Sequence, residues 1–415
     1  YIQDFRVYTG VAKYTSNFVP AATNPDILPD TPSGVSGSSK LTKITDGAVS
    51  FDGTGDRLTA DIGSGGLQSD FCVEYWIYAD GISGDRGHFQ ISEQSGGLDT
   101  SNTSLMVSWG NSEGDTNMYV GNANVTNIND PNQNNVWKHY AVVRNSGTLK
   151  LYVNGKEAYS ASNSVDMTSF RYVSISGYYS TSFLWKGFIS NFRVVSGSPV
   201  YTSSFTPPTA PLTNITNTKL LCCQSNTQAG AATTSPNMGG INDGTVWSDF
   251  TSASGGFNAS YPKYFLFDGQ TPSDANRAEA ASNNKPIDIT FNPPITVSST
   301  VSIWSGKSST QYMINNSGSY TTYSDAVGSY KDISHSGSLS NIKILHGDAA
   351  NNAAGLSAIK IDGTQLKDPV SAAGDAAATN FNPFITDINT VRGQETGYAT
   401  LNPLAVVGSA TYSDG

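Results

Sequence analysis

Short runs of alternating apolar and polar residues, separated by glycine, asparagine, aspartate and serine, constrain the fold of this chain most strongly. In FCVEYWIYA at 71–79 both alternating faces are largely apolar, which is typical of a central strand covered on both sides. In TLKLYVNGKEAYS, Asn154-Gly155 lies between two alternating runs and predicts a hairpin with a type I′ turn. Strand-like runs at such short intervals predict antiparallel β-sandwiches.

The composition agrees with this prediction. Only 13% of the residues are charged, and the chain contains 41 glycines and 21 tyrosines. This mixture suits strands joined by tight turns and lacks an excess of strong helix formers. A chain of 415 residues is expected to form about two to four domains. We therefore predict an all-β protein of tandem antiparallel β-sandwich (jelly-roll) domains, joined by linkers rich in Pro, Ser, Gly and Asn.

One stretch of sequence occurs twice. YIQDFRVYTGVAKYTSNFVP at 1–20 and FISNFRVVSGSPVYTSSFTP at 188–207 agree at ten of their twenty positions. The matched pairs include Phe5 and Phe192, Arg6 and Arg193, Tyr14 and Tyr201, and Phe18 and Phe205. Self-similarity of this kind indicates repeated modules.

Shifts in composition divide the chain into six segments. Two of them, at 21–45 and 209–244, are polar and have no clear periodicity, which is typical of linkers. The other segments are 1–20, a sandwich at 46–208, a second small β-sandwich at 245–368 and a linker at 369–415. The family resemblance given in the next paragraph implies that 1–20 is the C-terminal end of a preceding module and that 369–415 leads to a further module.

Four motifs carry a resemblance to a known family. They are AVSFDGTGDRL, FCVEYWIYAD, WKHYAVVRNSGTLKLYVNGK and GFISNFRVVSGSPVYTSSFTPP. In order and spacing they resemble the successive strands of laminin-G-like, concanavalin A-like jelly-roll modules over about residues 46–208. The resemblance implies that residues 1–20 are the last strand and exit segment of a similar module. Residues 245–368 are similar to a small sandwich of marine-phage fibre proteins, and 377–404 resembles the segment that introduces a further concanavalin-like module there.

Several functional classes are not expected. A net charge of −10 argues against a phosphate-binding surface, so nucleic acid is not an expected partner. The sequence has no apolar run of 18 residues, so membrane insertion is not expected either. Cys72, Cys222 and Cys223 are too few for a disulfide framework, and we expect them to be small buried apolar side chains.

The sequence does not support catalysis. A retaining glycosidase needs two facing carboxylates, but Asp70 and Glu74 lie four residues apart on one strand, a separation of about 13 Å. The four histidines are scattered without the spacing of a zinc site or a catalytic triad; they are His88, His139, His335 and His346. We expect a protein that is not an enzyme.

Calcium is a candidate cofactor because laminin-G-like modules sometimes hold this ion at a loop end. FDGTGDRL supplies Asp52 and Asp56, and YADGISGDRG supplies Asp80 and Asp85. Ca²⁺ takes six or more oxygen ligands, which such acidic loops can provide together with waters. The same residues are ordinary turn formers, and this alternative stays open.

Glycan binding is the function that we expect. Sugar sites combine an aromatic platform with side chains that fix the hydroxyls. Three stretches offer these features: Trp109, Asn111 and Asp115 in VSWGNSEGD, Tyr178 and Tyr179 in ISGYYSTS, and Trp304 and Tyr312 in SIWSGKSSTQY. Each of these residues is also compatible with a role in the core or in a loop.

The resemblance to marine-phage proteins implies a fibre or appendage protein on the virion surface. Its expected partners are host-surface glycans and other virion subunits or copies of itself. Repeated modules suit this role because weak binding at each site becomes avidity when many copies act together. Two alternatives remain open, a purely structural spacer or filament subunit and an extracellular bacterial adhesin.

Overall fold

The computed structural model consists of strands, turns and two short 3-10 helices over the residues that it describes, and these contain no α-helix. The described residues are 47–94, 104–110, 115–121, 123–130, 134–178, 183–323, 328–348, 350, 352–384, 386–389 and 394–396. The predicted preceding-module segment at 1–20 and linker at 21–45 lie outside them. Two compact units result, one spanning 46–384 and the other containing the hairpin of β28 (Thr386–Asn389) and β29 (Gln394–Thr396).

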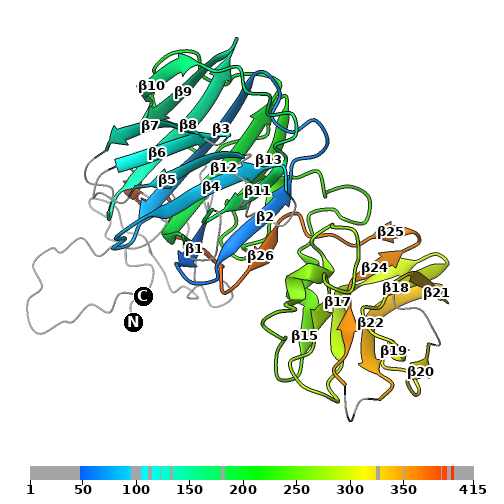
Figure 1. The fold of residues 1–415 in the computed structure, drawn as a ribbon. Helices are drawn as coiled ribbons and strands as arrows, with labels where there is room; N and C mark the ends of the chain where they lie inside the picture. Colours follow the sequence, from blue (N-terminus) through cyan, green and yellow to red (C-terminus); the bar gives the residue numbers. More distant parts are fainter. Residues whose placement is uncertain are drawn as a thin grey trace, which may run out of the picture. The chain divides into compact units, whose positions relative to one another are not determined.

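The first sandwich has two layers, drawn in Figure 1, which we name sheet A and sheet B. Sheet A has the strand order β10-β9-β8-β3-β12-β1-β27, with β13 and β14 added beside β12. Its strands are β1 (Ala48–Asp52), β3 (Phe71–Ala79), β8 (Trp137–Asn145), β9 (Thr148–Val153), β10 (Lys156–Ser162), β12 (Lys186–Ser196), β13 (Thr218–Cys222), β14 (Ala232–Thr234) and β27 (Ala377–Thr379).

Sheet B has the strand order β26-β2-β11-β4-β5-β6-β7. Its strands are β2 (Arg57–Asp61), β4 (Arg86–Ser92), β5 (Ser104–Trp109), β6 (Asp115–Val120), β7 (Ala123–Asn129), β11 (Tyr172–Ile175) and β26 (Ser371–Ala373). The strand pairs within both sheets are antiparallel. The prediction of an all-β protein with antiparallel sandwiches is confirmed.

Strand β3 shows how the sequence builds the core. It pairs with β8 on one side and β12 on the other, as expected of a central strand. Phe71, Val73 and Tyr75 point into the core between the sheets, because alternate residues of a strand face opposite sides. The predicted turn between β9 and β10 is also present, with positive φ angles of 48° at Asn154 and 74° at Gly155.

The segment at 209–244, which we expected to be a linker, instead contains strands of sheet A. Leu220 and Leu221 of β13 pair with Val194 and Arg193 of β12, and both leucines are buried. Likewise, residues 371–379 in the expected linker at 369–415 form β26 and β27, which pair with β2 and β1. The chain therefore returns to the first sandwich after residues 245–368, and local composition could not indicate such long-range pairing.

Residues 245–368 form a second set of sheets around a separate apolar core. One sheet has the order β15-β17-β22-β19-β20, another has the order β21-β18-β24-β25, and β16 pairs with β23. The strands are β15 (Thr251–Ala253), β16 (Ala278–Glu279), β17 (Ile287–Val297), β18 (Thr300–Trp304), β19 (Thr310–Ile314), β20 (Thr321–Thr322), β21 (Tyr330–Ser334), β22 (Gly337–His346), β23 (Gly355–Leu356), β24 (Ala358–Ile361) and β25 (Thr364–Gln365).

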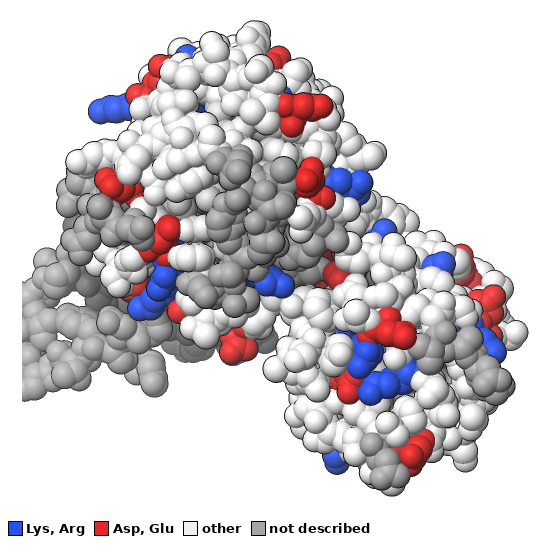
Figure 2. Space-filling view, viewed as in Figure 1, with Lys and Arg blue, Asp and Glu red and all other residues white. Residues whose placement is uncertain are grey.

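Two 3-10 helices, η1 (Trp247–Phe250) and η2 (Lys263–Leu266), precede most of these strands. The apolar run in YFLFDGQ at 264–270 predicts a strand, but the structure has η2 at its beginning. Within the described residues, no helix is both long and apolar enough to cross a membrane. Figure 2 shows that the charged side chains on the visible face are few, with acidic and basic groups intermixed.

Candidate functional site

The aromatic residues proposed for sugar binding in the first sandwich are mostly buried. Trp109 has 2% of its surface exposed and packs in the core with its ring 6.1 Å from that of Trp185. Tyr178 is also buried, stacks 4.8 Å from Phe183 and donates its hydroxyl hydrogen to Asp85. Their ring faces are therefore committed to packing, contrary to the prediction that they offer open platforms.

The remaining proposed sugar residues are dispersed. Asp115 begins β6, where its Oδ2 accepts a 3.4 Å hydrogen bond from Asn127. In the second sandwich Trp304 is buried, and Tyr312 is half-buried against the core, so neither is an open platform. Asn111 and Tyr179 lie outside the described residues.

The four aspartates proposed for calcium lie at the end of β1 or in the loops that follow β1 and β3. Asp56 is buried, and its two carboxylate oxygens accept the backbone N–H groups of Asp52 at 2.9 Å and Asp375 at 2.5 Å. Burial raises the pKa of Asp56, and this carboxylate acts as a clamp for the turn. Asp80 is exposed, and Asp85 accepts from Tyr178. Where the structure describes the chain, no group of three or more His, Cys, Asp or Glu side chains is arranged so that it could hold a metal ion, and calcium stays a prediction.

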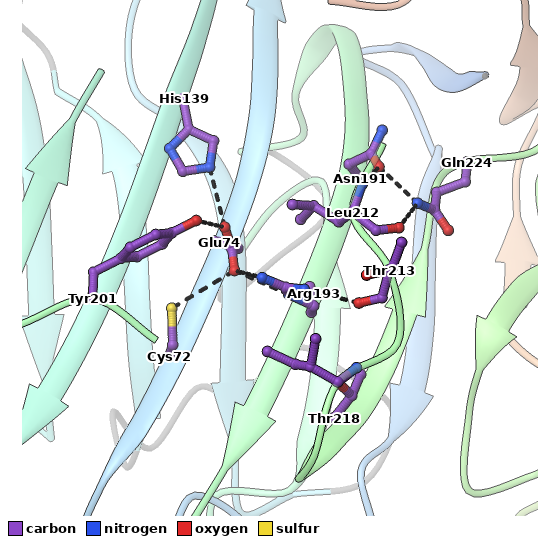
Figure 3. Close-up of polar contacts among 11 residues, drawn as sticks. Cys72, Glu74, His139, Asn191, Arg193, Tyr201, Leu212, Thr213, Thr218 and Gln224 are labelled. Carbon is purple, nitrogen blue, oxygen red and sulfur yellow. Dashed lines mark hydrogen bonds and ion pairs between the residues drawn. The ribbon is translucent and has the colours of Figure 1, made fainter. Parts of the chain in front are cut away.

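A polar cluster on the outer face of sheet A has residue types found in catalytic sites (Figure 3). Oε1 of Glu74 accepts two hydrogen bonds from Arg193, at 3.0 Å from Nε and 2.5 Å from a terminal nitrogen. Oε2 accepts the Tyr201 hydroxyl at 2.8 Å and lies 3.3 Å from Nε2 of His139, which is not aligned for a hydrogen bond. Cys72 lies 4.0 Å from Oε1.

Burial gives this cluster a structural role. Glu74, His139 and Cys72 have no exposed surface, so no substrate reaches them. Burial alone would raise the pKa of Glu74, but the nearby His139 imidazole and Arg193 guanidinium outweigh it and lower this pKa below its ordinary value. The ionised carboxylate holds residues 197–213, which we name the strap, across sheet A through the Tyr201 hydroxyl. Arg193 reaches the other end of the strap by donating to the Thr213 carbonyl oxygen at 2.8 Å.

The candidate site is a shallow groove on the outer face of sheet B, with a cavity volume of about 40 Å³. One wall comes from β2, where Arg57, Thr59 and Asp61 alternate and so share one face. Tyr172 of β11 extends this wall because it pairs directly with Asp61. The opposite wall contains four side chains at and just after η2, which are Tyr264, Phe265, Asp268 and Gln270.

Backbone hydrogen bonds hold the two walls together. The carbonyl oxygen of Phe267, next to η2, accepts the backbone N–H of Asp368 at 2.9 Å. Two residues later, the N–H of Val370 donates to Gly230 at 3.1 Å, and the chain then enters β26. Because β26 pairs with β2 at Arg57, the segment that carries η2 is fixed beside the strand that forms the first wall.

The polar side chains in the groove differ in how many of their atoms have hydrogen-bond partners. Asp61 accepts a bidentate pair of hydrogen bonds from Arg171, one of them 2.8 Å long, and a further one from the Gly63 N–H at 2.8 Å. Asp268 accepts from the Gln270 N–H and from the Asn276 side chain, both at 2.9 Å. Burial raises the pKa of Asp268 to about 6, although these hydrogen bonds oppose the shift.

Arg57, the basic residue of the groove, has a nitrogen without a hydrogen-bond partner among the described residues. Burial raises the pKa of Tyr264, and the neighbouring Arg57 guanidinium partly offsets this rise. Nε of Arg57 is buried and has no hydrogen-bond partner among the described residues. Aromatic rings together with fixed donors and acceptors can bind the apolar face and the hydroxyls of a sugar.

None of the groove-lining residues was proposed from the sequence. They lie on three segments more than 80 residues apart, and the second wall depends on η2, where a strand had been expected. The alternation in RLTAD was a usable signal, because it places Arg57, Thr59 and Asp61 on the same face of one strand.

A family model supports the fold of the first sandwich. Residues 52–199 match Laminin_G_3, described as the concanavalin A-like lectin/glucanases superfamily. The match runs from the end of β1 to just beyond β12, and the predicted resemblance of this segment is confirmed. No curated protein matches the sequence.

Solved structures with similar folds include three proteins at 17–18% identity. A carbohydrate-binding protein of Bacteroides ovatus, described as putative, has a TM-score of 0.33, with 47% of this chain and 56% of that chain covered. A heptameric SAP-like pentraxin of Limulus polyphemus has a TM-score of 0.32, with coverages of 39% and 80%. Domain 4 of the Geobacillus stearothermophilus arabinanase AbnA, in complex with arabinotriose, has a TM-score of 0.30, with coverages of 37% and 72%.

Proposed function

We propose that this protein binds glycans without cleaving them, through the groove on sheet B. The observation that carries the proposal is the presence of Tyr172, Tyr264 and Phe265 together with fixed polar side chains in one concave place. A sugar ring packs its C–H face on an aromatic ring, while hydrogen bonds to its hydroxyls set its orientation. The match of residues 52–199 to a lectin-containing superfamily supports the same function.

The bonding of the two groove carboxylates supports binding without hydrolysis. A glycosidase needs one carboxyl group to protonate the leaving oxygen and a second carboxylate as nucleophile or base. Both oxygens of Asp61 accept hydrogen bonds from Arg171, and both oxygens of Asp268 accept from neighbouring N–H groups. Carboxylates held in this way suit the fixed positioning of a ligand.

The proposed setting is the virion surface of a phage, where the protein is a fibre or appendage that contacts glycans of the host. A cavity of about 40 Å³ can enclose only part of one sugar, so we expect weak binding at each site. Many copies on one particle would convert weak binding into avidity. The sequence repeat between 1–20 and 188–207 supports a modular appendage. A structural spacer and a bacterial adhesin remain the alternative settings.

Screening the complete chain on a glycan array, followed by calorimetry on the best ligand, tests this function. Tyr172→Ala and Tyr264→Ala should each weaken binding at least about tenfold, because each removes one aromatic wall. Tyr320→Ala, a partly exposed tyrosine in the second sandwich, is the matched control and should bind as wild type does. Undiminished binding by both groove variants would exclude this site, and release of reducing ends would exclude a purely binding role.

A further inference from the structure

We propose that the groove selects saccharides that carry a carboxylate, such as uronic or sialic acids, and that Arg57 is the residue that recognises this group. The inference rests on the proposed function and names the substrate class of the same site. Its basis is a difference in hydrogen bonding within the groove. The acidic side chains have hydrogen-bond partners, whereas one nitrogen of the basic side chain has none among the described residues.

The acidic side chains of the groove already have hydrogen-bond partners. Asp61 is neutralised by Arg171, whose guanidinium donates from two nitrogens to the two carboxylate oxygens. Asp268 accepts one hydrogen bond on each oxygen, from Gln270 and Asn276. These carboxylates can still accept hydrogen bonds from sugar hydroxyls, but neither has a buried oxygen without a partner among the described residues.

Arg57 differs from these residues. Among the polar atoms of the described groove-lining side chains, its Nε is the only one that is buried without a hydrogen-bond partner. A desolvated cationic N–H is costly to leave unbonded, and a carboxylate is the acceptor that best matches the guanidinium group. A carboxylate that binds beside the Arg57 guanidinium, which lines the groove, would compensate its charge.

The position of Arg57 keeps its charge available. Arg57 and Asp61 are four residues apart on β2, which by strand rise is a separation of about 13 Å. The Arg171–Asp61 pair therefore lies at the other end of the wall and does not neutralise Arg57. Because Tyr264 lies beside the Arg57 guanidinium, a sugar whose carboxylate meets Arg57 also meets an aromatic ring.

Attraction by the whole protein does not explain a preference for acidic sugars. The chain has a formal net charge of −10, which repels anionic ligands over long distances. Binding of a carboxylated sugar thus requires a local cationic site. This makes the preference a specific property of the groove and allows a mutation at Arg57 to be compared with loss of the same charge elsewhere.

Calorimetry with the complete chain and three matched probes tests the inference. The probes are a galacturonic acid tetrasaccharide, its methyl ester and the corresponding neutral galactose tetrasaccharide, which share one linkage and differ in the acidic group. A sialylated oligosaccharide and its asialo form test whether the groove recognises the carboxylate of a sialic acid instead of that of a uronic acid. We expect one acidic member of these sets to bind about tenfold or more tightly than its uncharged partner.

Variants assign the preference to Arg57. Arg57→Gln should abolish the difference between the affinities for acidic and uncharged probes. Arg57→Lys should restore only part of the difference, because lysine keeps the charge but not the planar donor group. Lys156→Gln removes the same charge from an exposed position on β10 and should retain the full preference. Thermal unfolding of each variant checks that it is folded.

The outcomes separate this inference from the proposed function. Equal affinity for acidic and uncharged probes would overturn the role of Arg57 and leave glycan binding intact. Equal losses of preference in Arg57→Gln and Lys156→Gln would also overturn it, because the effect would then be general electrostatics. Failure of every saccharide to bind would overturn both the inference and the proposed function.

Discussion

Arg193 on β12 donates two hydrogen bonds to a single oxygen of Glu74 on β3, and the pair is almost fully buried. The other oxygen of Glu74 accepts the hydroxyl of Tyr201, which lies in the strap. One carboxylate thus joins two neighbouring strands to the segment that leaves the sheet. The Glu74 carboxylate thus stabilises the outer face of sheet A, whereas apolar packing stabilises the interior.

Removal of the Glu74 charge should destabilise the first sandwich strongly. In Glu74→Gln the Arg193 guanidinium stays buried without its counterion, a change that costs about 3–5 kcal/mol in comparable buried pairs. Glu157→Gln is the control, because Glu157 pairs with Lys150 at 2.8 Å in an exposed position where solvent screening makes the loss much smaller. Urea unfolding measures both values, and similar losses in the two variants would contradict the structural role of Glu74.

The hairpin turn after β9 also supports the strap. Gly155 has a φ of 74°, and a Cβ atom placed there would lie 1.9 Å from the carbonyl oxygen of Phe205 in the strap. Gly147 has a similar φ of 77°, but a Cβ atom there would meet nothing within 4 Å. Gly147→Ala should therefore cost only the left-handed conformation, about 1–2 kcal/mol. Gly155→Ala should cost clearly more, and equal losses of unfolding free energy would show that the strap does not pack on this turn.

Asp368 should make stability depend on pH. It is buried, its Oδ2 has no hydrogen-bond partner among the described residues, and burial raises its pKa to about 7. The folded protein keeps this proton up to about pH 7, whereas the unfolded chain releases it near 3.8. The free energy of unfolding should therefore fall as pH rises from 4 to 7, by at most about 4 kcal/mol, and then level off.

The variant Asp368→Asn isolates this contribution. The amide cannot ionise, so the decline assigned to Asp368 should be absent, and the variant should be more stable than wild type at pH 8. The oxygen that accepts the Ser248 N–H at 3.2 Å is retained in the amide. Urea unfolding at pH 5 and pH 8 provides the comparison. Parallel pH profiles for the two proteins would show that Asp368 does not carry the predicted effect.

The sequence predicted the elements whose signal is local. The alternation in FCVEYWIYA gave β3, and Asn154-Gly155 gave the turn between β9 and β10. The repeat also identified Arg193 and Tyr201, both of which contact Glu74, although it did not show why they recur. The returns of β26 and β27 to the first sandwich depend on pairing with strands more than 300 residues earlier, for which a local pattern gives no signal.

The candidate site was less predictable than the fold. The aromatic residues chosen from loop-like sequence included Trp109, but SLMVSW places Leu105, Val107 and Trp109 on the same inward face of β5. That alternation was visible in the sequence and argued for a core position. The groove required the structure, because Tyr264 reaches Arg57 only through the hydrogen bonds that fix η2 beside β26.

The affinity of the groove for a carboxylated sugar should increase as pH falls from 7 to 5. Asp268, whose pKa is raised to about 6, loses its negative charge over this range. A sugar carboxyl with a pKa of about 3.5 stays ionised, so repulsion between the two groups disappears. The other charged or titratable side chains at the groove are Arg57, Asp61, Arg171, Tyr172, Tyr264 and, close to Gly269, Lys367.

In Asp268→Asn this repulsion is absent at every pH, so the variant should bind the acidic probe at pH 7 as wild type does at pH 5. The neutral probe is the control, since its affinity should depend little on the charge of Asp268 in the wild type. Calorimetry at pH 5, 6 and 7 measures both. An acidic probe that binds wild type more weakly at pH 5 than at pH 7 would contradict the expected sign, and an unchanged pH profile in Asp268→Asn would assign the titration to another group.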